Sequence, residues 1–226
     1  MITVQDLLEI DLPIIQAPMA GVQGSALAVA VSNAGGLGSL PCATLAPDAM
    51  RKELAAIRAQ TTKPFNVNFF CHTQPEPSAE QEAIWRDRLS PYFAEHGIDA
   101  SAIPTGPGRL PFSEEAADVL GEIRPAVVSF HFGLPSKALL ARVRSWGAKV
   151  LSSATTVDEA RWLEAHGVDA VIAQGIEAGG HRGSFLSEDL SEQLGTFALV
   201  PQIVDAVKIP VIAAAASRTR EVSRLP

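Results

Sequence analysis

The segment from residue 174 to residue 183, Gln-Gly-Ile-Glu-Ala-Gly-Gly-His-Arg-Gly, contains the residue types that a catalytic loop needs. His181 is the kind of side chain best suited to proton transfer near neutral pH. Gly179 and Gly180 would let the backbone approach a bulky planar or phosphorylated ligand, because neither residue has a side chain. The segment follows an apolar run, 170–173, that is typical of a buried parallel strand. Since α/β barrels keep their chemistry just beyond such strands, we predict that His181 is catalytic.

A second histidine, His131, lies within the run Ser-Phe-His-Phe-Gly at 129–133. Because side chains alternate along a strand, His131 would share one face with Ser129 and Val127. Two polar side chains near the end of a strand favour a pocket. A strand histidine can equally be a hydrogen-bonded residue of the core, and both interpretations of His131 are open on this ground.

Three amide side chains, those of Gln16, Asn68 and Gln174, interrupt strands that are otherwise apolar. A buried amide needs hydrogen-bond partners, and a single one is commonly structural. Three amides at strand ends on the same rim indicate hydrogen bonding to a heteroaromatic ring. The backbone after Gln16 ends the predicted first strand and could lie against such a ring.

The composition excludes several classes of protein. The 226 residues carry a net charge of −7 with scattered Lys and Arg, so nucleic acid is not an expected partner. The sequence has neither an apolar run long enough to span a membrane nor an N-terminal signal pattern, so no membrane partner is expected. Cys42 and Cys71 are too few for a disulfide framework, and a reducing, cytoplasmic setting fits. Cys71 and His72 are adjacent, but no further ligands follow at zinc-binding spacing, so no metal site is expected.

Short apolar runs alternate with helical patterns, which is typical of βα units and a parallel sheet with right-handed crossovers. Thr156 and Glu159 have the spacing of a capping box at the start of one predicted helix. No G-x-G-x-x-G follows the first predicted strand, which disfavours a Rossmann sheet. The predicted fold is therefore α/β, a (β/α)8 TIM barrel that is incomplete here, with about seven strands and the last βα units missing. The predicted strands are 14–19, 37–40, 65–70, 126–132, 149–153, 170–173 and 211–214. The predicted helices are 25–34, 47–59, 79–93, 139–146, 157–166 and 194–207.

A polar segment at about 72–111, rich in Pro, Glu and Ser, is predicted to be an insertion after the third strand. The predicted organisation is thus one ligand-binding barrel domain at 1–214, which contains this insertion, and a tail at 215–226.

Four separated segments resemble the nitronate monooxygenases, a family formerly called 2-nitropropane dioxygenases. The likeness extends from about residue 10 to residue 214, and the four segments occur in the family's order. They are 13–21, 33–40, 65–72 and 177–183. The runs at 69–72 and 129–133 look like the class I branch in particular.

The resemblance implies that FMN binds at the carboxyl rim of the barrel. It also implies oxidation of an alkyl nitronate, or of the parent nitroalkane, by O2 to a carbonyl compound and nitrite, with an oligomer possible. His181 would be the active-site histidine, and His131 a second histidine of the pocket. The implied flavin contacts are Asn68, Gln174, Gly179, Gly180 and the backbone of Ala17, Pro18 and Met19.

Two alternatives remain. The flavin-dependent enoyl-ACP reductases share the Gly-Gly-His segment but would require a nicotinamide. The chain could also be an inactive truncated fragment, because Ala215 to Pro226 stand where the family has Gly-Gly-Ile-Ala-Asp and continues. Deleting one base from GC-rich codons for Gly-Gly-Ile-Ala-Asp-Ala gives Ala-Ala-Ser-Arg-Thr-Arg, which is the sequence at 215–220. A one-base frameshift near codon 215 is therefore a hypothesis, and the 226-residue chain is expected to bind FMN weakly or not at all.

Overall fold

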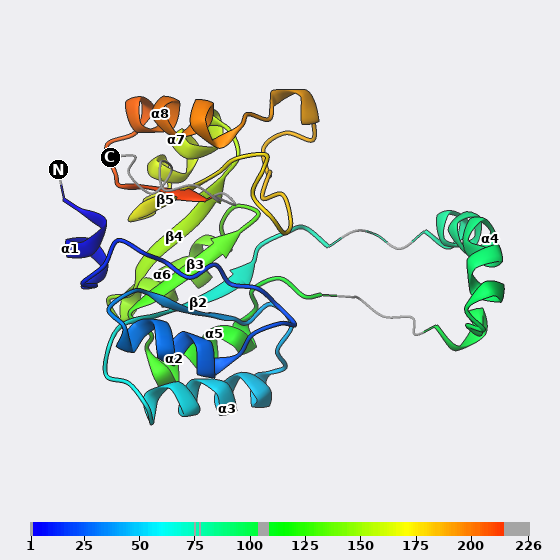
Figure 1. Cartoon of the computed structure of the whole chain (residues 1–226), viewed down its shortest axis with the longest axis horizontal. Helices are drawn as coiled ribbons and strands as arrows, with labels where there is room; N and C mark the ends of the chain where they lie inside the picture. The colour runs from blue at the N-terminus through cyan, green and yellow to red at the C-terminus, as the bar shows by residue number, and fades with distance from the viewer. Residues whose placement is uncertain (1, 75, 77, 104–108, 215–226) are drawn as a thin grey trace. The chain divides into compact units, whose positions relative to one another are not determined.

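The computed structural model of the chain divides into two compact units. The larger unit comprises residues 1–72 and 111–226, and the smaller one comprises residues 73–110. Figure 1 shows the order of the elements along the chain. The residues that the structure describes are 2–74, 76, 78–103 and 109–214.

The larger unit contains one curled sheet of six parallel strands, and the order of the strands in the sheet is their order in the chain. This α/β arrangement confirms the predicted fold class and is consistent with part of a TIM barrel. The strands are β1 (Gly38–Pro41), β2 (Phe65–Phe70), β3 (Val127–His131), β4 (Lys149–Ala154), β5 (Ala170–Gln174) and β6 (Val211–Ala214).

The strand predicted at 14–19 is reduced to a single parallel bridge between Ile15 and Leu37. The Gln16 N–H donates to the carbonyl of Leu37 at 3.0 Å, but the ladder goes no further. The next carbonyl, that of Ala17, accepts a hydrogen bond from the side chain of Gln23, and Pro18 has no N–H to donate. The predicted seven strands are therefore six strands and a bridge among the described residues.

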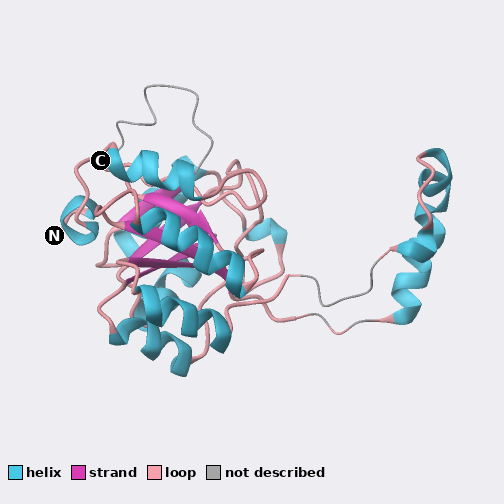
Figure 2. Cartoon of the chain, turned by 90° about the horizontal axis from the view of Figure 1, so that it is seen from below, coloured by secondary structure: helices cyan, strands magenta, loops and turns pink. Residues whose placement is uncertain are grey.

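Helices pack against the outer face of this sheet, and Figure 2 shows them arranged around the strands. Their apolar residues form one core cluster with strand residues such as Val67, Val128 and Phe130. α5 was not predicted, although Ser113 caps it and Glu114 begins it. The helices on this face are α2 (Ser25–Asn33), α3 (Pro47–Arg58), α5 (Glu114–Ile123), α6 (Lys137–Ser145), α7 (Val157–Ala165) and α8 (Thr196–Ala206), with a 3₁₀ turn η2 (Leu190–Glu192) before α8. A further helix, α1 (Val4–Leu8), packs at the amino ends of the strands instead.

The inner face of the sheet changes in chemistry along the strands. At the amino ends it is apolar, and Leu7 and Leu8 of α1 pack there with Leu37, Val127 and Leu151. Because Val127 lies in this cluster and Val128 in the outer one, the alternation predicted for β3 is confirmed. Toward the carboxyl ends Phe70 shares this face with polar side chains. These polar side chains are Ser39, Asn66, Asn68, Ser129, His131, Ser153 and Gln174.

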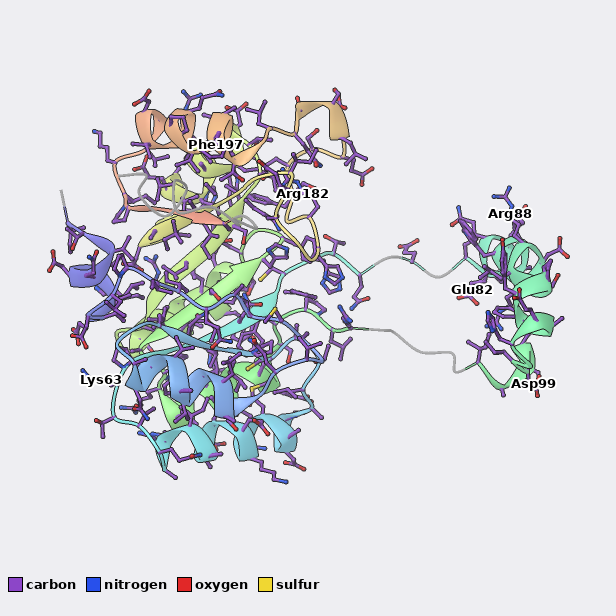
Figure 3. The ribbon with its side chains drawn as sticks, viewed as in Figure 1. Lys63, Glu82, Arg88, Asp99, Arg182 and Phe197 are labelled. Atoms are coloured by element: carbon purple, nitrogen blue, oxygen red, sulfur yellow. The ribbon has the colours of Figure 1, made fainter. Side chains whose placement is uncertain are left out.

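The smaller unit consists mainly of α4 (Ala79–Glu95) and a 3₁₀ turn, η1 (Ala100–Ala102). Ser78 caps α4, and no residue of this helix is buried. The Arg86 guanidinium donates to the carbonyl of Ala100 at 2.8 Å, and Arg88, labelled in Figure 3, lies over the ring of Trp85. This unit is therefore held by caps and surface contacts.

In the part of the chain that the structure describes, no helix is both long and apolar enough to cross a membrane. The residues of the predicted aberrant tail, 215–226, lie outside the described residues.

Candidate functional site

A long loop connects β5 to α8 and carries His181. Its two ends are joined where the N–H of Ile176 donates to the carbonyl of Leu194 at 2.9 Å. The carboxylate of Glu177 accepts the backbone N–H of Thr196 at 2.9 Å and its hydroxyl at 3.0 Å, at the amino end of α8. Hydrogen bonds from its own N–H and from Thr196 lower the pKa of Glu177. The loop is therefore closed at its base by a charged cap.

Gln174, the last residue of β5, holds the middle of this loop. Its Nε2 donates to the carbonyl of His181 at 2.8 Å, and its Oε1 accepts the N–H of Gly183 at 2.7 Å. Glycine is required at 183 because an added Cβ would lie 2.6 Å from the ring of His131. The predicted site residue Gln174 thus binds the protein's own backbone through both ends of its amide.

His131 also binds the loop. Its Nε2 lies 2.9 Å from the carbonyl of His181, and its Nδ1 lies 3.0 Å from the hydroxyl of Ser153. A carbonyl can only accept, so Nε2 carries the proton and Nδ1 accepts from Ser153. Burial lowers the pKa of His131, which favours this neutral form. The geometry is that of a residue that positions His181, and the predicted catalytic role of His131 stays a prediction.

The His181 ring lies among aromatic side chains at the rim. Its centroid is 5.3 Å from that of Phe70 and 6.1 Å from that of Phe132, both with edge-to-face geometry. The ring of His72 lies 6.0 Å from Phe132. Phe132 has φ +67°, a conformation that costs about 1–3 kcal/mol for a residue with a side chain. Such strain is concentrated at functional sites, and here it places a phenyl ring beside the predicted catalytic histidine.

Of the other predicted amides, Asn68 lies on β2 and Gln16 follows the bridge at Ile15. Asn68 is 6% exposed, and its Nδ2 donates to the hydroxyl of Ser129 at 2.9 Å. Gln16 makes paired hydrogen bonds, both 3.2 Å long, with the backbone N–H and carbonyl of Ser39. Gln16 therefore ties the first segment to β1, which is a structural role.

Gln23 was missed by the sequence reasoning. Its Nε2 donates to the carbonyls of Ala17 and Ser39, at 3.1 and 3.3 Å. Its Oε1 is buried and has no hydrogen-bond partner among the described residues. The available signal was a polar residue in a short stretch bounded by Gly21 and Gly24.

The remaining predicted ligand contacts are open backbone. Ala17 and Met19 are exposed, and Pro18 is partly exposed. Gly179 and Gly180 are exposed as well, and a Cβ added to either would meet no described protein atom within 4 Å. Of these two, Gly180 has φ +87°, which favours glycine whatever the space.

Arg182, labelled in Figure 3, fastens the loop to the end of β5. Its Nη1 donates to the carbonyls of Gln174 and Gly175, each at 2.6 Å, and its Nε donates to Gln193 at 2.8 Å. Burial lowers the pKa of Arg182. Nη2 is buried without a partner in the described part of the chain.

Glu159 is a second residue whose importance the sequence reasoning missed. The predicted capping box is half present, because the N–H of Glu159 donates to the hydroxyl of Thr156 at 3.2 Å. The carboxylate does not return to Thr156. It accepts from Thr155 and from the loop residues Phe185 and Leu186 instead. Hydrogen bonds to Thr155 and to the distant loop residues have therefore replaced the expected bond to the backbone of Thr156.

Cys71 and His72 are adjacent in sequence, and a metal site would need further ligands near them. No group of three or more His, Cys, Asp and Glu side chains among the described residues is placed to hold a metal ion. Burial raises the pKa of the Cys71 thiol far above its usual range, which favours the protonated form.

The sequence profile of the nitronate monooxygenases matches residues 2–221. This chain therefore belongs to the nitronate monooxygenase family, a family of flavin-dependent oxidoreductases, and the predicted family is confirmed. It is 48% identical over 215 residues to the nitronate monooxygenase of Paraburkholderia phytofirmans, and 47% identical over 210 residues to that of Pseudomonas aeruginosa. Each alignment covers 92% of this chain but only 57% and 60% of the relative, so the chain spans less than two thirds of their length.

Two solved structures are also similar to this chain. The nitroalkane oxidase of Streptomyces ansochromogenes superposes with a TM-score of 0.77 at 40% identity, over 90% of this chain and 58% of its own. FabK of Thermotoga maritima superposes less well, with a TM-score of 0.66 at 32% identity, over 93% of this chain and 52% of its own. The nitroalkane-oxidising relative is therefore the better structural match of these two.

Proposed function

We propose that the whole protein oxidises alkyl nitronates with O2 to a carbonyl compound and nitrite, with FMN bound at the carboxyl rim of the sheet. The observation that carries this proposal is the placement of His181. Its ring lies against Phe70 and Phe132, on a loop whose neighbouring glycines present open backbone, in a chain of the nitronate monooxygenase family.

The residues at this rim fit a flavin. A planar ring needs open backbone beside it, which Gly179 and Gly180 offer. Its pyrimidine edge carries carbonyl acceptors and an N–H donor. The unpartnered Oε1 of Gln23 suits such a donor, and the unpartnered Nη2 of Arg182 suits an acceptor. We assign the remaining contacts to Asn68, Gln174 and the backbone of Ala17, Pro18 and Met19.

When bound, FMN would supply the redox step. The chain's own residues would prepare the substrate. His181 would remove the α-proton of a neutral nitroalkane, or balance the negative charge of a nitronate already formed. Phe70 and Phe132 would contact the alkyl group and keep water from it. His131, with both ring nitrogens engaged, would hold the backbone at 181 and leave the proton transfer to its neighbour.

The proposed organisation is a barrel domain at 1–214 that contains the segment at about 72–111. A small-molecule nitronate and O2 would be its partners in a cytoplasmic setting. Neither nucleic acid nor a membrane has a place in this proposal.

The test uses this chain beside a chimera in which the C-terminal part of the Paraburkholderia relative follows Ala214. We expect the chimera to bind FMN stoichiometrically and to consume O2 when given the nitronate of a short nitroalkane. A folded chimera that binds FMN without consuming O2 would contradict the proposed activity. NADH oxidation that depends on an enoyl thioester, without nitronate turnover, would establish the reductase alternative.

A further inference from the structure

A buried carboxylate lies behind the loop that carries His181. Glu159, in the first turn of α7, is 1% exposed and is among the largest fully buried side chains of the larger unit. An acidic side chain is rarely buried so completely unless hydrogen bonds compensate for its lost hydration. The partners of Glu159 therefore indicate what the carboxylate is for.

The two carboxylate oxygens face in different directions. Oε2 accepts the backbone N–H of Thr155 at 2.6 Å and the hydroxyl of Thr155 at 2.8 Å, at the end of β4. Oε1 accepts the backbone N–H of Phe185 at 2.6 Å and that of Leu186 at 3.2 Å. Three of the four donors are backbone N–H groups, which cannot accept a hydrogen bond in return. A carboxylate suits this position, whereas an amide would turn an NH2 group toward a backbone N–H.

These bonds fix one arm of the loop. Gln174 and His131 hold the backbone at 181, and Glu159 holds it at 185 and 186. The ring of Phe185 packs against Trp162 at 5.2 Å between centroids. The arm from residue 181 to residue 186 therefore has a side-chain anchor at each end.

We propose that Glu159 is a positioning residue: its carboxylate fixes the returning arm of the loop and thereby the place of the His181 ring at the rim. The proposal rests on the proposed function for the role of His181. Glu159 does not contact the substrate in this account, and it acts only through the backbone at 185 and 186.

The experiment compares Glu159→Gln with Glu164→Gln in this chain. Glu164 lies on the same helix, and its carboxylate accepts the backbone N–H of Lys208 at 2.6 Å, away from the loop, so it is a matched control. We expect amide hydrogen exchange at 185 and 186 to accelerate about 10-fold or more in Glu159→Gln. The amide has one acceptor oxygen where the carboxylate has two, so its NH2 group faces a backbone N–H at one end and the anchor to the loop loosens. We also expect the His181 ring resonances to move, because the ring shifts relative to Phe70 and Phe132. Glu164→Gln should change neither reading.

A folded Glu159→Gln protein with unchanged exchange and unchanged His181 resonances would overturn the proposal. A lower melting temperature with unchanged His181 resonances would overturn it too, because Glu159 would then support the fold alone. If Glu159→Gln does not fold, Glu159→Asp decides by the same criteria, since its shorter side chain cannot reach both Thr155 and Phe185.

Neither the hydrogen exchange nor the His181 resonances depend on flavin. Failure of the chimera to bind FMN would therefore not contradict the role of Glu159, and a negative result for Glu159 would not contradict the proposed activity. In the chimera, Glu159→Gln should lower kcat about 10-fold with little change in KM, because a displaced group costs rate more than binding. A change in KM alone would contradict the assigned role.

Discussion

The two ends of the sheet's inner face differ in every property that matters for function. At the amino ends, Leu37, Val127 and Leu151 are almost fully buried and α1 packs over them. At the carboxyl ends, polar side chains meet a loop whose tip, including His181, is exposed. One end is closed by apolar packing, and the other is ordered by hydrogen bonds that leave backbone accessible. The residues that stabilise the fold and those proposed for the chemistry are therefore separated along the strands. Substitutions at the apolar end should lower stability, and substitutions at the polar end should lower activity or ligand binding.

The largest effect is expected from Leu151→Ala at the apolar end. Leu151 is 0% exposed, and truncation of a buried leucine leaves a cavity, so the free energy of unfolding should fall by about 3 kcal/mol. Leu27→Ala is the control, because Leu27 is 40% exposed and should change stability by less than about 0.5 kcal/mol. Urea unfolding followed by circular dichroism measures both. Equal, small losses would mean that the amino end is not the stabilising end.

His181→Asn should give the opposite pattern. Turnover of a neutral nitroalkane by the chimera should fall about 100-fold or more if His181 is a general base, while stability and FMN content remain unchanged. Preformed nitronate should be affected less, because it has already lost its proton. His166→Asn is the control, since His166 lies at the end of α7 and stacks on Trp162. Parent-like turnover of the nitroalkane in His181→Asn would remove His181 from the mechanism.

Gly179→Val should separate ligand contact from folding. No described protein atom lies within 4 Å of a Cβ at this position, so the melting temperature of the flavin-free protein should stay within a few degrees of the parent value. FMN affinity should fall about 10-fold or more, because the side chain would meet the flavin. Gly121→Ala is the control, because Gly121 has equal room but lies on α5. Retained FMN affinity would refute the close approach of this backbone to the ligand.

The smallest effect is expected in the pH dependence of stability. Burial lowers the pKa of His131 below the value of about 6.5 that an unfolded chain has. The unfolded state therefore binds the proton more readily, and stability should be lost as the pH falls from about 6.5 toward the folded pKa. His131→Gln should flatten this part of the curve. Ser153→Ala, which removes the hydroxyl partner but keeps the imidazole, should preserve it, and identical curves for parent and His131→Gln would exclude His131 as the cause.

The features predicted correctly from the sequence are those that depend on the local order of apolar and polar residues. Apolar runs such as 170–173 located the strands, and period-two alternation correctly separated Val127 from Val128. The prediction of a strand at 14–19 was wrong because Pro18 has no N–H to donate and the side chain of Gln23 occupies the carbonyl of Ala17. A hydrophobic pattern carries no information about either feature. The role of Glu159 could not be predicted, because its acceptor oxygens bind residues 26 and 27 positions later. Local sequence patterns predicted only the capping box of Thr156 and Glu159.

The strand order also has a consequence for biosynthesis. Because every strand pairs with the next one along the chain, the sheet can grow in step with translation, one βα unit at a time. The candidate site cannot. The carbonyl that His131 binds lies 50 residues later in the chain. Synthesis of that length takes roughly 3–10 s at ribosomal speeds of about 5–20 residues per second. β1 to β5 therefore precede the loop that carries His181 along the chain, whereas β6 follows it, so the loop can be assembled on strands that are already paired.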